Sequence, residues 1–102
     1  MSIRKKIELN NCQDRFQALT SGNLGRLTDI EIDGSTLVEQ KAFQSINYDP
    51  LGKGNNIMIM LNGFTHTINN PIELYMEERD NGVLARLEII DETDTLTLLK
   101  LI

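Results

Sequence analysis

Hydrophobic and polar residues alternate along most of the chain beyond Gly25, and this alternation predicts β-strands. Three Asn-Gly or Asp-Gly pairs, at positions 33–34, 62–63 and 81–82, interrupt the alternation. Such pairs tolerate the positive φ angles of tight hairpin turns, so each one marks a reversal of chain direction. We therefore predict about six antiparallel strands joined by short turns, as a β-meander over residues 26–102.

The N-terminal segment follows a helical pattern instead. Its apolar residues recur at intervals of three or four and form one stripe of a helix: Leu9, Cys12, Phe16 and Leu19. This spacing predicts a short helix over about residues 11–20, with Asn11 as its N-cap and Gly22 as its end. Ile3 and Ile7 precede the helix and predict a short strand or a clasp.

The expected pairs test each hairpin. A two-residue loop at 62–63 pairs Ile59 with His66, and it places Met58 and Met60 opposite Thr67 and Thr65 on the other face. A two-residue loop at 81–82 pairs apolar residues with each other, Met76 with Leu87 and Leu74 with Ile89. On the other face it pairs the acidic Glu77 with the basic Arg86. A slip by one residue would oppose apolar and charged positions instead.

A further turn at Glu92–Thr93 extends this sheet by one strand. It would gather six apolar side chains on one face of the meander: Leu74, Met76, Leu87, Ile89, Leu96 and Leu98. The successive residues Leu98 and Leu99 break the alternation, which indicates a bulge. We expect the last strand, 96–102, to form an edge of the sheet that can pair with another chain.

These elements predict a single domain over residues 1–102 of the α+β class, mostly β. The short N-terminal helix packs on a strongly bent antiparallel sheet of about six strands. The sheet is expected to stay open around the helix or to close partly into a barrel.

The charge is unevenly distributed along this acidic chain, whose net charge is −5. Residues 1–26 carry five basic and two acidic side chains, a net of +3, and the remainder carries 5 basic and 13 acidic ones, a net of −8. We therefore expect the basic end to lie against the acidic body, either of the same copy or of another, and binding to nucleic acid is disfavoured. The single cysteine and the lack of a long apolar run favour a cytoplasmic protein without a membrane segment.

His66 is the only histidine, and thus the only side chain with an ordinary pKa near neutrality. It is a candidate ligand-binding group or general base, although a hydrogen-bonded histidine at the sheet margin is the commoner case. The segment Asp29–Gly34 resembles the start of a calcium loop, but the glutamate required at its twelfth position falls on Gln40. We predict no catalytic residue, no metal ligand and no cofactor.

A moderately apolar surface is the best sign of a partner. Four residues would share the outer face of one hairpin: Met58, Met60, Thr65 and Thr67. They form a contact for a protein partner or a homodimer, or else a second buried layer under the helix. The leading hypothesis is a non-catalytic interaction or oligomerisation module. The alternatives are a small-ligand-binding or hydrolytic domain using His66, and an Sm-like RNA-binding barrel.

Several segments together resemble a known family. They are Ile46–Pro50, Ile57–Leu61, Thr65–Leu74, Leu87–Ile89 and Thr95–Leu99, and the most distinctive is Thr-His-x-Ile-x-x-Pro at residues 65–71. The chain resembles an uncharacterised family of short bacterial proteins, a domain of unknown function with an N-terminal helix followed by antiparallel strands. Cys12 stands where that family is expected to have a large aromatic residue, and Thr93 where it has a turn glycine. The resemblance implies the fold and no activity.

Overall fold

A computed structural model describes residues 3–49, 54–80 and 83–102. It contains one α-helix, one short 3-10 helix and eight strands in that part of the chain. In chain order they are β1 (Ile3–Lys6), η1 (Leu9–Asn11), α1 (Cys12–Asn23), β2 (Leu27–Ile32), β3 (Ser35–Asp49), β4 (Asn56–Leu61), β5 (Phe64–Asn69), β6 (Pro71–Glu78), β7 (Leu84–Asp91) and β8 (Leu96–Leu101).

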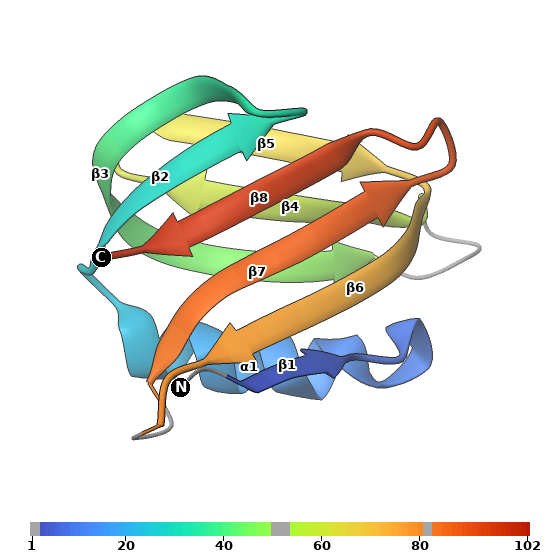
Figure 1. The fold of residues 1–102 in the computed structure, drawn as a ribbon, viewed down its shortest axis with the longest axis horizontal. Coiled ribbons are helices and arrows are strands. Elements are labelled where there is room, and N and C mark those ends of the chain that lie inside the picture. Colours follow the sequence, from blue (N-terminus) through green and yellow to red (C-terminus); the bar gives the residue numbers. More distant parts are fainter. Residues whose placement is uncertain (1–2, 50–53, 81–82) are drawn as a thin grey trace.

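All eight strands belong to one antiparallel sheet in the order β1-β6-β7-β8-β2-β3-β4-β5. Figure 1 shows the sheet folded over into two layers, and the 15-residue strand β3 passes from one layer to the other. Register shifts in the pairing of β3 with β2 and β4, together with a φ of 51° at Gln40, mark the bulges that let this strand bend. The predicted fold class is confirmed, with eight strands rather than about six. The sheet is not closed, because β1 and β5 form its two ends.

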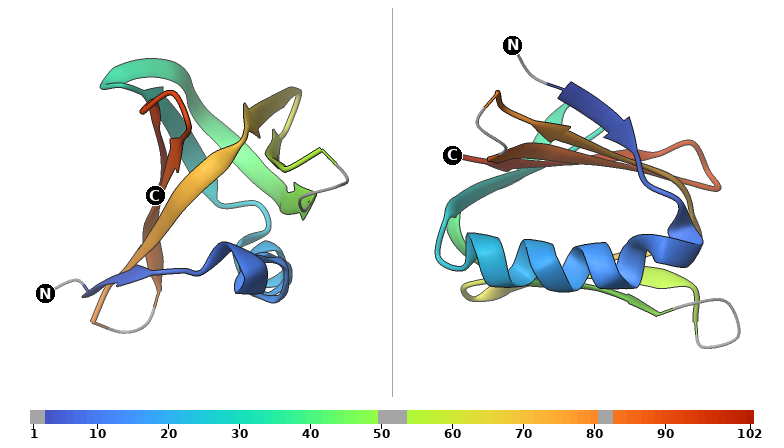
Figure 2. Two further views of the ribbon diagram at one scale, coloured as in Figure 1. Left: turned by 90° about the vertical axis from the view of Figure 1, so that its right-hand side faces the viewer. Right: turned by 90° about the horizontal axis from the view of Figure 1, so that it is seen from below.

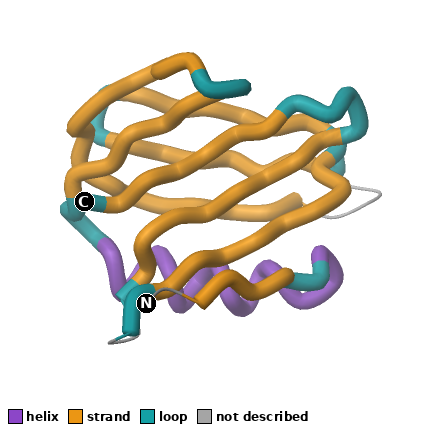
Figure 3. The backbone as a smooth tube through the Cα atoms, viewed as in Figure 1, coloured by secondary structure: helices purple, strands orange, loops and turns teal. Residues whose placement is uncertain are grey.

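Helix α1 lies across the open end of the folded sheet, between its two layers (Figures 2 and 3). Cys12 and Phe16 are buried in the core and Leu19 packs against it, as the predicted stripe requires. The helix runs beyond the predicted end at Gly22, because the left-handed residue that reverses the chain is Gly25, with a φ of 81°. Asn11 is the N-cap, but its side chain makes no capping hydrogen bond.

Two predicted hairpin registers are confirmed. In the first, Ile59 pairs with His66, while Met58 and Met60 pair with Thr67 and Thr65. In the second, between β6 and β7, the pairs are Leu74 with Ile89, Met76 with Leu87, and Glu77 with Arg86, and the last pair forms an ion pair of 3.2 Å. Nearer the turn this register shifts by one residue, so that Glu78 faces Leu84 rather than Ala85. The loop at 81–82 that connects these strands lies outside the described residues.

The predicted register of the last hairpin is wrong by one residue. Leu87 pairs with Leu99, and Ile89 pairs with Thr97, so the side chains of Leu96 and Leu98 lie on the other face. The cause is a loop of three residues rather than two. The Asp91 N–H donates to the Thr95 carbonyl and closes the loop, and Asp94 within it adopts a φ of 61°. The alternation then needs no bulge at 98–99, because Thr97, Leu99 and Leu101 are the buried residues of β8.

Strand β8 is not an edge, contrary to the prediction. It pairs with β7 on one side and with β2 on the other, through a register that includes Ile30 opposite Leu99. The aliphatic core lies inside the folded sheet, and several of its members are less than 2% exposed: Ile30, Ile46, Ile57, Ile59, Leu74, Leu87, Ile89 and Leu99.

Candidate functional site

The predicted interaction surface lies on the outer face of the β4–β5 hairpin. Met60 is 36% exposed, Thr65 and Thr67 are exposed, and Met58 is half-buried. Their neighbours along the strands, such as Ile57 and Ile59, face the core instead. The alternative in which these four side chains form a second buried layer under the helix is therefore wrong.

Strand β5 adds an open backbone edge to this surface. The Asn70 N–H donates to the Asn55 carbonyl at 2.8 Å, which fixes the phase of the ladder between β5 and β4. Alternate residues of β5 then direct their backbone N–H and C=O groups towards β4. The residues between them, Thr65, Thr67 and Asn69, direct theirs away from it. Among the described residues, β5 pairs only with β4, so these outward N–H and C=O groups have no strand partner.

The opposite edge of the sheet, β1, has a different character. It consists of Ile3, Arg4, Lys5 and Lys6, all exposed. Arg4 Nε contacts Glu88 Oε2 at 2.7 Å and its guanidinium lies 3.8 Å from the centre of the Tyr75 ring, while Lys5 Nζ lies 3.2 Å from Glu78 Oε1. The basic N-terminal segment thus lies against acidic residues of the same chain, which is one of the two arrangements predicted. Charged side chains of this kind discourage pairing of an edge with another chain.

His66 lies on the inner side of β5, beside a polar cavity of about 280 Å³ whose lining includes Ile32, Asp91 and Thr95. The imidazole is half-buried, and burial lowers the pKa of His66 below its ordinary value. Within residues 3–49, 54–80 and 83–102 it makes no hydrogen bond or ion pair. A general base needs a carboxylate or hydroxyl within hydrogen-bonding reach, and none of the described residues supplies one to His66 in this structure.

The lowered pKa of His66 gives an expected pH dependence of stability. In the unfolded chain His66 binds a proton near its ordinary pKa of 6.5, whereas in the folded chain it binds the proton only at lower pH. The free energy of unfolding should therefore fall as the pH drops from above 6.5 towards the folded pKa. Urea unfolding across this range should show a smaller fall for His66→Gln than for the wild type. An equal fall in both proteins would contradict the assignment to His66.

The acidic residues near the turns serve the backbone. Asp91 Oδ1 accepts hydrogen bonds from Thr93 N at 2.9 Å, Thr93 Oγ1 at 2.7 Å and Thr95 N at 3.1 Å. Burial alone would raise the pKa of Asp91, but these hydrogen bonds outweigh it and lower the pKa. Asp29 Oδ1 likewise accepts from the Gln40 N–H at 2.8 Å, and Asp33 Oδ1 accepts from the Leu96 N–H at 2.9 Å. The segment that resembles a calcium loop is thus strand β2 and its turn, with its carboxylates already engaged.

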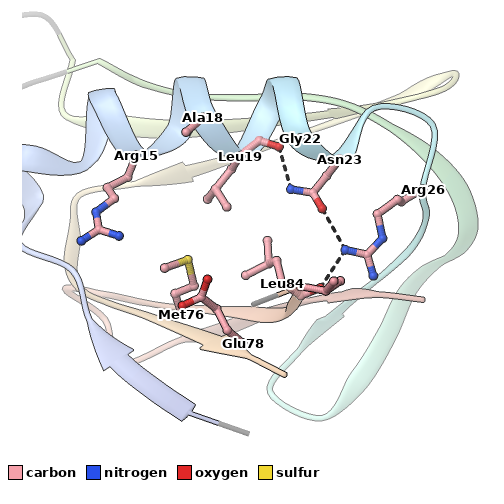
Figure 4. A pocket seen from close by; sticks show the side chains of 10 residues that line it. Arg15, Ala18, Leu19, Gly22, Asn23, Arg26, Met76, Glu78 and Leu84 are labelled. Atoms are coloured by element: carbon pink, nitrogen blue, oxygen red, sulfur yellow. Dashed lines mark hydrogen bonds between the residues drawn. The ribbon is translucent and has the colours of Figure 1, made fainter. Parts of the chain in front are cut away.

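A second cavity, of about 400 Å³, lies between α1 and the β6–β7 side of the sheet, and we call it the helix–sheet groove (Figure 4). Leu19, Met76 and Leu84 supply its apolar lining, and Arg15 and Arg26 stand towards its two ends. No sequence pattern predicted this groove, because its walls come from segments about 60 residues apart.

Arg26 joins the end of α1 to the sheet. Its Nη1 donates to Asn23 Oδ1 at 2.8 Å and to the Leu84 carbonyl at 2.7 Å, and its Nη2 donates to the Leu101 carbonyl at 3.3 Å. Asn23 in turn donates to the Leu19 carbonyl at 2.8 Å. Burial, and then the charge of Arg79, lower the pKa of Arg26. All three acceptors are neutral oxygens, so the guanidinium charge is not balanced by a carboxylate in the described part of the chain.

The model of a family of unknown function, DUF5335, matches residues 3–102. The chain belongs to this family. No curated protein and no solved structure gave a match. The predicted resemblance to an uncharacterised family is therefore confirmed, and the DUF5335 match brings no activity, substrate or partner with it.

Two positions at which this DUF5335 chain was expected to differ from its relatives can be placed in the structure. Cys12 is fully buried at the start of α1, and burial raises the pKa of its thiol to about 11, so it acts as a small apolar residue rather than a nucleophile. Thr93 lies in the last turn, where its hydroxyl donates to Asp91.

The only α-helix of the described chain is too short and too polar to cross a membrane.

Proposed function

We propose that this chain is a non-catalytic self-association module, in which strand β5 pairs with β5 of a second copy. The observation that carries the proposal is the contrast between the two ends of the sheet. The edge strand β1 carries Arg4, Lys5 and Lys6, whereas the edge strand β5, with the sequence Phe-Thr-His-Thr-Ile-Asn, carries no carboxylate, lysine, arginine or proline. Proteins normally protect an edge with one of these devices, so an unprotected edge favours a pairing partner.

The pairing of β5 with itself is chemically consistent. Two-fold symmetry requires an antiparallel arrangement, and a register centred on His66 places Thr65 of each copy opposite Thr67 of the other. These are the residues whose backbone groups point away from β4, so the strands can exchange main-chain hydrogen bonds. Cross-strand threonine pairs are favourable. His66 faces His66 of the second copy in this register, and both imidazoles are neutral above their lowered pKa.

The outer face beside this edge is moderately apolar. Met58 and Met60 lie one strand further in, on the same side as the threonine side chains. Methionine adapts its shape to a partner surface, and two threonine methyl groups add apolar area. We also propose that the association takes place in a reducing compartment such as the cytoplasm, because the single cysteine is a buried thiol.

Thr67→Pro is the sharpest test of this proposal. Proline removes the N–H of residue 67, which points away from β4, so the variant keeps the hairpin but cannot complete the intermolecular ladder. Light scattering after size-exclusion chromatography should give a dimer for the wild type and a monomer for Thr67→Pro. Circular dichroism should give the same spectrum for both.

Lys6→Pro is the matched control on the other edge. The Ile7 N–H donates to the Leu74 carbonyl, so the backbone of Lys6 likewise points away from its partner strand. This variant should remain dimeric. A monomeric wild type, or a Thr67→Pro variant that is still a dimer, would overturn the proposal.

The other two functions have weaker support. Hydrolysis by His66 lacks a partner group, as described above. The RNA-binding hypothesis needs basic and aromatic side chains together on one exposed face. The basic side chains Arg4 and Lys5 are instead paired with glutamates of the same chain, and the net charge is −5.

A further inference from the structure

The helix–sheet groove has the size and lining of a small-molecule site. Its volume of about 400 Å³ falls within the range of about 300–1,000 Å³ that is usual for ligand pockets. Figure 4 shows Leu19 projecting from the helix towards Met76 and Leu84 of the sheet, which leaves an aliphatic passage between them. Met76 and Leu84 are also core residues, so this lining is held by the packed interior.

The charge around the groove is positive. Among the described residues of the lining, Glu78 is the one carboxylate, and it forms an ion pair with Lys5 Nζ at 3.2 Å. Within the part of the chain that the structure describes, Arg26 donates only to neutral oxygens, and the charge of Arg79 lies near enough to lower the pKa of Arg26. The remaining cation, Arg15, makes no ion pair or hydrogen bond with any residue that the structure describes. An aliphatic passage flanked by unbalanced guanidinium groups complements an amphipathic anion.

We propose that the helix–sheet groove binds an aliphatic carboxylate, with the carboxylate at Arg15 and the chain between Leu19, Met76 and Leu84. Arg26 is tied to the backbone at one end of the groove, whereas Arg15 reaches the other end with its guanidinium uncommitted (Figure 4). The planar fork of an arginine matches the two oxygens of a carboxylate, which favours this head group over a neutral one. This inference does not depend on the proposed pairing of β5, which lies at the other end of the sheet.

Octanoate is a suitable probe, because it carries one carboxylate on a short aliphatic chain. Isothermal titration calorimetry of the full chain should show saturable binding of octanoate. Octylamine, which has the same chain and the opposite charge, should bind at least about tenfold more weakly, since it loses the charge-assisted hydrogen bonds. Acetate, which has the carboxylate without the chain, should not bind measurably.

Two variants locate the binding in the groove. Arg15→Gln should weaken octanoate binding by about tenfold or more. Ala18→Trp should abolish it, because Ala18 is an exposed lining residue of the helix and a large side chain there fills the passage. Gln17→Trp is the matched control, since Gln17 is exposed on the same helix but does not line the groove, and it should bind octanoate as the wild type does.

The outcomes are distinct. No heat of binding with octanoate would overturn the inference, as would equal binding of octanoate and octylamine, because charge would then play no part. Unchanged binding in Ala18→Trp would place the ligand elsewhere and would also overturn it. All the variants should keep the far-ultraviolet spectrum and the oligomeric state of the wild type, so this result is separable from the test on β5.

Discussion

The variant Leu87→Ala should be less stable than the wild type by about 2–5 kcal/mol in free energy of unfolding. Leu87 is fully buried in β7, the strand that joins β6 to β8, where it pairs with Met76 on one side and Leu99 on the other. Truncation removes buried methyl groups and leaves a cavity in a sheet that is held on both sides and cannot collapse to fill it. The cost should therefore combine the lost burial with the cavity term.

Urea denaturation followed by circular dichroism measures this difference, and Leu37→Ala supplies the control. Leu37 is also a leucine in a β-strand, but it lies near the start of β3 and is 43% exposed. Its truncation should change the free energy of unfolding by no more than about 0.5 kcal/mol. Equal effects of the two substitutions would show that Leu87 is not at the centre of the core.

The second large effect is expected at Arg26. Replacement by leucine removes the donor shared by the Asn23 side chain and the carbonyls of Leu84 and Leu101. Polar groups left without partners in a part-buried site are costly, and we expect a loss of about 2–4 kcal/mol in the free energy of unfolding. Hydrogen exchange should also speed up in the last turn of α1, since Arg26 and Asn23 fasten that turn to the sheet.

Arg79→Leu is the appropriate comparison for Arg26→Leu. Arg79 is exposed, and its charge opposes the charge of Arg26, so its removal should leave stability unchanged or slightly raised. A loss confined to Arg79→Leu, with no loss in Arg26→Leu, would contradict the role assigned to Arg26.

Local hairpins were the part of the fold most open to prediction. The pairs Ile59–His66 and Glu77–Arg86 follow from an Asn-Gly loop and from matching the character of facing residues, which involves only neighbouring strands. The predicted register of the last hairpin was wrong because Asp94 adopts a left-handed conformation without being glycine. The three-residue loop therefore resembled a two-residue loop in the sequence. A difference of one loop residue is sufficient to turn Leu96 and Leu98 to the opposite face.

The candidate sites were only partly predictable. The alternation placed Met58, Met60, Thr65 and Thr67 on one face, but it did not indicate that β5 ends the sheet. The helix–sheet groove gave no signal at all, because Arg15 and Leu84 are distant in the chain and neither belongs to a recognisable motif.

The sequence by itself determined the helix, two of the hairpins and the inner faces of most strands, since these depend on residue spacing, turn chemistry and contacts between neighbours. Only the tertiary structure decided that β1 and β5 are the edges, that β8 is central, and that Arg26 ties the helix to β7 and β8. The physical reason is that strand order and long-range hydrogen bonds depend on how the open, bent sheet folds over the helix. That arrangement is a property of the whole core, to which every buried side chain contributes and which no local pattern encodes.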